Sequence, residues 1–123
     1  MKLSVIVSPY TGPDEAAVSR HIRYARACMR DALIRGEAPY ASHLLYTQPG
    51  VLDDRVPAER ELGMRAGLAR LLRACDVVAV YTDCGISNGM HHDIGIAIAM
   101  GHLIEYRQIA AIWDTRQTRE GWT

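Results

Sequence analysis

The chain has 123 residues, 49% of them hydrophobic, and its 14 basic residues balance its 14 acidic residues. This composition favours a globular protein with its own core over a disordered chain. The zero net charge argues against non-specific nucleic-acid binding and against attachment to an anionic membrane surface. We therefore expect a single domain over residues 1–123.

The cysteines and the N-terminal residues indicate in which cellular compartment the protein is expected. Cys28, Cys75 and Cys84 form no CxxC pair, so neither a disulfide framework nor a zinc ribbon is predicted. Free cysteines suit a reducing compartment. The first ten residues resemble a strand without a signal-peptide cleavage site, and no segment approaches the roughly 20 apolar residues that span a bilayer. A cytoplasmic protein is expected.

The first half of the chain predicts two strands separated by a helix. The β-branched run at 3–8 is typical of a buried strand. Pro13 suits the first position of a helix that runs to about Arg35 and stops at Gly36. Residues 38–46 are expected to form the second strand. The side chains expected on the core face of the helix are Val18, Ile22, Ala25, Met29 and Leu33.

The second half predicts two more helices and three strands. Pro57 is expected to open a helix through roughly Cys75. Residues 76–83 form the clearest strand pattern, and a helical pattern starts at Asn88. The two remaining strands are expected near 103–107 and over 108–114.

The alternation of strands and helices predicts parallel βαβ units. About five strands in this length favour a flavodoxin-like, doubly wound parallel sheet in a three-layer αβα fold. In such folds ligands bind beyond the carboxyl ends of the strands. The residues expected at that edge are Ser8, Pro9, Tyr10, Gly12, His43 and those from Asp83 to Gly89.

Asp93 is the most unusual residue of the predicted helix that starts at Asn88. Its neighbours at helical spacing are Gly89, Met90, Ile96 and Ala97, none of which is polar. A carboxylate among apolar side chains is costly unless something pairs with it. The partner is either an arginine or backbone amides elsewhere in the fold, or a ligand. In the second case the helix dipole favours the anion while desolvation raises its pKa.

The segment GISNG, residues 85–89, precedes this helix. Its glycines with Ser87 and Asn88 predict a flexible loop that ends in a helix cap. Backbone N–H groups at such a place bind phosphate, although an ordinary βα turn has the same pattern. If a phosphate binds, we expect it at Ser87, because Asp14 and Glu15 would repel it from the loop after the first strand.

The histidines give weaker signals. His91 and His92 adjoin Asp93, but adjacent helical residues point about 100° apart, so these three do not form a chelating face. No metal site is expected. His43, near the predicted end of the second strand, either binds substrate or caps the strand.

Three segments together resemble the nucleoside 2-deoxyribosyltransferase-like superfamily, which includes nucleotide N-glycosidases and small phage and bacterial proteins. They are SPYTG after the first strand, the CD that opens the central strand, and GISNGMHHDIGIAIAMG, and the resemblance spans roughly residues 3–112. The family nucleophile is a carboxylate just before the apolar run of this helix, and Asp93 occupies that position. Family members usually have glutamate there, so the side chain of Asp93 is shorter by one methylene than the usual nucleophile.

The resemblance implies retaining-glycosidase chemistry, in which a carboxylate attacks the anomeric carbon of a nucleoside. It implies no metal and no redox cofactor. It also implies Asp83 as a second acidic residue that holds the sugar or the base, with Tyr10 and Gly12 lining the pocket. Together with the residues at the sheet edge, the substrate-binding set is Ser8, Tyr10, Gly12, His43, Gly85, Ser87, Asn88, Gly89 and Met90.

Two functions lead from the sequence, and a purely structural subunit is a third possibility. One is an N-glycosidase or deoxyribosyltransferase that acts on a nucleoside or nucleotide. The other is a binding protein that sequesters a nucleotide or nucleotide-derived signal without turnover. The shorter side chain of Asp93 bears on the choice between enzyme and binding protein. A catalytic carboxylate misplaced by about 1 Å loses about a hundredfold in rate. A homo-oligomer is also expected, because Met64, Met90, Ile98 and Met100 are a surplus of apolar side chains.

Overall fold

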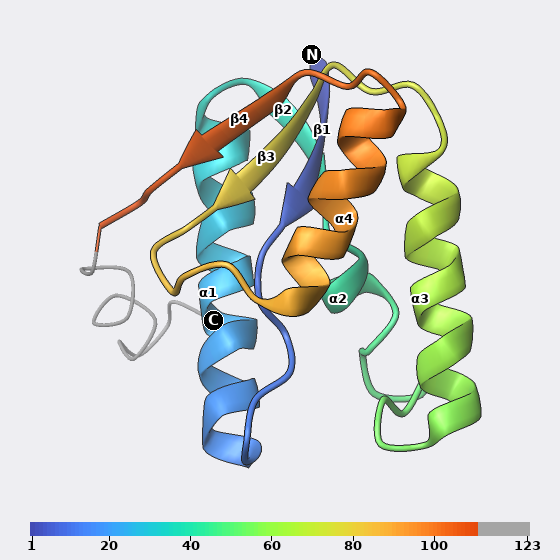
Figure 1. Ribbon diagram of the computed structural model, residues 1–123. Coiled ribbons are helices and arrows are strands. Elements are labelled where there is room, and N and C mark those ends of the chain that lie inside the picture. The colour runs from blue at the N-terminus through green and yellow to red at the C-terminus, as the bar shows by residue number, and fades with distance from the viewer. Residues whose placement is uncertain (111–123) are drawn as a thin grey trace.

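Four parallel strands form the sheet in the described part of the chain, which is residues 1–110 of this computed structural model. In their order across the sheet they are β2 (Glu37–Tyr40), β1 (Lys2–Val7), β3 (Val77–Tyr81) and β4 (Ile104–Arg107). Each neighbouring pair is parallel. The order β2-β1-β3-β4 is that of a flavodoxin-like sheet, so the predicted fold class is confirmed (Figure 1).

Helices cover both faces of the sheet and complete the three layers (Figure 1). Side chains alternate between the faces of β1. Ile6 therefore joins the core beneath α1 (Glu15–Ile34), whereas Val5 and Val7 join the core beneath α4 (Asn88–Ala99). Helix α3 flanks α4 and adds Leu71 to that second core. The bounds of these helices are α1 Glu15–Ile34, α3 Pro57–Leu71 and α4 Asn88–Ala99.

The second strand is shorter than predicted. A strand over 38–46 is wrong, because β2 ends at Tyr40 and Ser42–Leu45 form a short helix, α2. The carbonyl of Ala41 accepts hydrogen bonds from the backbone of the last two residues of α2, which turns the chain out of the sheet. His43 consequently lies in α2 rather than at a strand end.

The predicted fifth strand over 108–114 falls partly outside the described residues. Residues 108–110 follow β4 without strand pairing. The backbone N–H groups of Ile109 and Ala110 donate to the Asp83 carboxylate instead of to a neighbouring strand. Ala110 also has a φ of 71°, which is incompatible with a strand.

The face of α1 that meets the sheet is rotated from the predicted one. Leu33 was expected in the core but is 51% exposed, whereas Ala25 is buried as expected. Small side chains allow a helix to approach a sheet closely, which places the larger aliphatic residues at the flanks. The buried residues of α1 are Tyr24, Ala25, Ala27, Cys28 and Ala32.

The other helix ends follow from their caps. Asp14, predicted in the first turn of α1, is its N-cap and accepts from the backbone N–H of Ala17. Helix α3 starts at Pro57 as predicted but ends at Leu71, short of Cys75. In the described part of the chain, no helix combines the length and apolar character needed to cross a membrane.

Candidate active site

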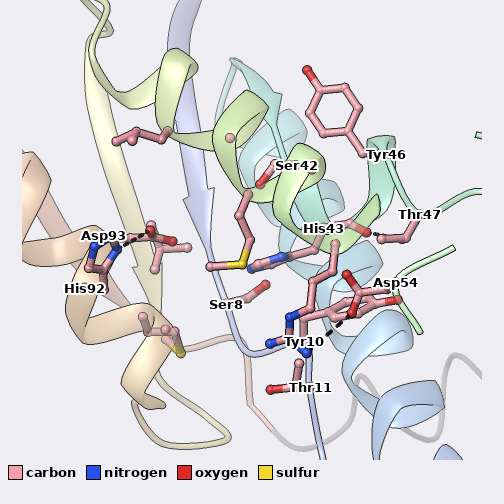
Figure 2. A pocket seen from close by; sticks show the side chains of 18 of the residues that line it. Ser8, Tyr10, Thr11, Ser42, His43, Tyr46, Thr47, Asp54, His92 and Asp93 are labelled. Carbon is pink, nitrogen blue, oxygen red and sulfur yellow. Dashed lines mark hydrogen bonds and ion pairs between the residues drawn. The ribbon is translucent and has the colours of Figure 1, made fainter. Parts of the chain in front are cut away.

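A cavity of about 700 Å³ opens at the carboxyl edge of the sheet. Its walls come from the end of β1, from α2, from α3 with the loop before it, and from the first turns of α4. Figure 2 shows side chains from these elements converging on the hollow. This volume is within the range of sites that bind small molecules. The edge predicted from the strand pattern is thus where the cavity lies.

Asp93 lies in the second turn of α4 and lines this cavity, so it is not part of the core. Its side chain is 33% exposed, and the Nδ1 of His92 is 3.7 Å from its Oδ1. Burial raises the pKa of Asp93, while the nearby imidazoles of His43 and His92 oppose that shift. No arginine pairs with Asp93 among residues 1–110. The alternative in which an arginine pairs with a buried Asp93 is therefore not found in residues 1–110.

His43 enters the same cavity from α2 (Figure 2). Its ring stacks on Tyr10, with centroids 5.5 Å apart and planes inclined by 23°. The backbone of Ser8 also favours the protonated form of the ring, and the Thr47 hydroxyl donates to the His43 carbonyl. Burial lowers the pKa of His43, while the negative charges of Asp93 and Asp54 raise it by smaller amounts. Stacking on Tyr10 therefore limits the orientations of the imidazole.

Ser8 contributes a buried hydroxyl to the cavity. The residue is 1% exposed, and its Oγ has no hydrogen-bond partner in the described part of the chain. A buried polar atom without a partner costs about 1–3 kcal/mol. A polar group of a bound ligand would supply the missing hydrogen bond.

The N-terminus of α4 forms a third wall of the cavity. Ser87 is the N-cap, and its Oγ accepts from the backbone N–H of Met90 at 3.3 Å. Ser87, Asn88, Gly89 and Met90 all line the cavity. The predicted loop and cap are therefore correct, and they face the hollow.

Three predicted site residues lie outside the cavity lining. The Asp83 carboxylate accepts from the Tyr24 hydroxyl at 2.5 Å and from the backbone N–H groups of Ile109 and Ala110 at 3.1 Å. This arrangement gives Asp83 a structural role, joining α1 to the segment after β4. Gly85 forms a turn with a φ of +81°, which explains the glycine.

Gly12 also has a structural explanation. A Cβ at this position would lie 2.4 Å from the Cβ of Ala17, which is closer than two carbon atoms can approach. The glycine therefore lets the loop after β1 pass over the first turn of α1. The structure does not include it in the cavity lining.

Sequence reasoning missed the wall that α3 and its preceding loop provide. Arg60 lines the cavity, and its Nη1 lies 3.9 Å from the Oδ2 of Asp54. Charged residues in loops and on helices usually face solvent, so the pattern carried no signal that these two side chains line a cavity. In the described residues no cluster of His, Cys, Asp or Glu side chains could hold a metal ion.

The comparisons with known proteins agree with this architecture. A family model described as a domain of unknown function, DUF7768, matches residues 2–107. The chain belongs to this family. No curated protein matches the chain. A solved structure of a 2-deoxyribosyltransferase from the psychrotolerant bacterium Bacillus psychrosaccharolyticus is similar, with a TM-score of 0.59 and 15% identity over 98% of this chain and 87% of that chain. That likeness shows a common fold.

Proposed function

We propose that this member of the DUF7768 family cleaves or transfers the N-glycosidic bond of a nucleoside or nucleotide, with Asp93 as the nucleophile. The observation that carries the proposal is a partly buried carboxylate that lines a cavity at the carboxyl edge of the sheet. Its raised pKa and its coupling to a nearby histidine are features typical of active-site groups. The shared fold with a 2-deoxyribosyltransferase agrees with this chemistry.

The reaction follows the logic of retaining glycosidases. An Asp93 carboxylate oxygen attacks the anomeric carbon as the bond from that carbon to the base breaks, and the bond pair leaves with the base. The product is a glycosyl ester on Asp93. Water or a second base then attacks the same carbon and releases the carboxylate. The Ser8 hydroxyl would bind the sugar or the base.

A second candidate is a nucleotide-binding protein without turnover. It is favoured by one observation, the length of Asp93, which is one methylene shorter than the glutamate usual in the resembling enzymes. In addition, the His92 imidazole lies 3.7 Å from the Asp93 carboxylate and competes with a substrate for contact with that carboxylate. Such a protein would use the same cavity and leave the ligand intact.

Incubation with a panel of purine and pyrimidine nucleosides and 5′-nucleotides, in ribose and 2′-deoxyribose forms, separates the two candidates. Chromatography reads the release of free base, and calorimetry reads binding. Release that disappears in Asp93→Asn supports the enzyme. Tight binding with an intact ligand supports the binding protein, and neither release nor binding would overturn both.

A further inference from the structure

We infer that His43 is the proton donor to the leaving base in this reaction, acting across the cavity from Asp93. This inference rests on the proposed function and assigns its second catalytic group. The cleavage of an N-glycosidic bond needs such a group, because an unprotonated base is a poor leaving group. General acid catalysis of this kind contributes typically about 10²–10⁴ in rate.

The position of His43 suits the role. Its ring and the Asp93 carboxylate come from different elements, α2 and α4, and line one cavity (Figure 2). They are close enough that each affects the titration of the other. A sugar bound against Asp93 would therefore place its base on the side of the cavity where His43 and Tyr10 lie.

The contacts of His43 leave one ring nitrogen for a ligand. The backbone of Ser8 favours the protonated ring, as a carbonyl beside a ring N–H does. No side chain in the described part of the chain hydrogen-bonds to either ring nitrogen. Stacking on Tyr10 keeps the ring from turning away.

The proton transfers balance over the two steps. In the first, the imidazolium of His43 donates its free N–H proton to a ring nitrogen of the base as the glycosidic bond breaks, and neutral imidazole remains. In the second, that imidazole accepts a proton from the attacking water as the ester of Asp93 opens. The carboxylate and the imidazolium are regenerated.

The charged groups around His43 set the pH dependence. Asp93 on α4 and Asp54 in the loop before α3 favour the imidazolium, whereas burial disfavours it more strongly. The donor form is therefore lost above a pKa that lies below the ordinary value of about 6.5. The profile of kcat/KM should fall on the basic side through this pKa, and on the acidic side as Asp93 is protonated.

The test compares two substrates in wild type, His43→Gln and His43→Asn. An ordinary purine nucleoside needs a proton on its leaving base, whereas a 7-methylated purine nucleoside carries a positive charge and leaves without one. We expect a loss of about 10²–10⁴ in kcat/KM on the ordinary substrate and a much smaller loss on the methylated one. The basic limb of the pH profile should also disappear. His91→Gln, which removes an exposed histidine outside the cavity lining, is the matched control.

An equal loss on both substrates would overturn the acid role of His43 while leaving the proposed function intact. Retention of the basic limb in both variants would do the same. Failure of the wild type to cleave either substrate, or any nucleoside of the panel above, would instead overturn the proposed function. The denaturant midpoint of each variant shows whether it remains folded.

Discussion

Asp93 and His43 line one cavity from two different helices, and each stabilises the charged form of the other. Burial acts on both in the opposite sense, raising the pKa of the carboxyl and lowering that of the imidazole. Stability and function therefore conflict at this pair in the unliganded protein. A bound ligand that contacts both groups would relieve the conflict.

The first prediction concerns the stability of Asp93→Asn. Because the folded pKa of Asp93 is raised above its unfolded value, the ionised carboxylate destabilises the fold, increasingly as pH rises from the unfolded towards the folded pKa. Its removal should leave the denaturant midpoint unchanged or raise it at neutral pH, and the difference should vanish at low pH. A fall equivalent to about 3–5 kcal/mol would instead indicate a broken structural ion pair. The oligomeric state must be the same in both proteins.

The second prediction concerns Arg107, which forms a buried ion pair with Glu37. Arg107 also contacts Tyr81, which belongs to the core beneath α1. Its guanidinium donates to both carboxylate oxygens of Glu37, at 2.9 and 2.6 Å, and both side chains are nearly inaccessible. Arg107→Met leaves the Glu37 charge unpaired, so it should cost about 3–5 kcal/mol at neutral pH. Arg55→Gln, which breaks the exposed pair with Asp53, is the control and should leave the denaturant midpoint unchanged.

This buried pair also has a pH signature. The hydrogen bonds from Arg107 hold the pKa of Glu37 below its ordinary value. The resulting stability is present above the unfolded pKa of about 4.3 and is lost as pH falls through the lower folded pKa. Arg107→Met should flatten the acid limb of the stability curve, and an unchanged limb would contradict the assignment.

The third prediction separates a structural from a functional role for Gly12. Gly12→Ala would place a Cβ 2.4 Å from that of Ala17, and this overpacking should cost about 1–3 kcal/mol. Ala17→Gly in the same chain should recover part of the loss. Gly95→Ala in α4 meets no atom within 4 Å and is the control, expected to be neutral or stabilising. A normal denaturant midpoint for Gly12→Ala would refute the clash.

The fourth prediction is self-association. Met64, Ile98 and Met100 are exposed, at 62%, 64% and 44%, whereas Met90 is buried and does not belong with them. If these side chains form one apolar patch, that patch is typical of an interface, and a closed homo-oligomer with a two-fold contact is the commonest solution. Light scattering at micromolar concentration should give more than the monomer mass of 13.7 kDa. A monomeric mass, or an assembly unaffected by Ile98→Glu, would count against it.

The sequence predicted the parallel sheet, the edge at which the cavity lies and the place of Asp93 on a helix, because strong β-branched runs and a helical pattern fix those features. It misplaced the segment around His43, because a short apolar run suits both a strand and a buried helix. It assigned Asp83 to the site by resemblance, whereas the hydrogen bonds that hold Asp83 come from Tyr24 and from the segment after β4. Such long-range partners leave no periodic signal in the chain.

The measurement that tests the central claim most directly is the mass of the protein after rapid quenching during turnover of a nucleoside. The account predicts a covalent adduct of one sugar, which peptide mapping assigns to the segment that contains Asp93 and which is absent from Asp93→Asn. The release of free base without any adduct, and at an unchanged rate in Asp93→Asn, would contradict it.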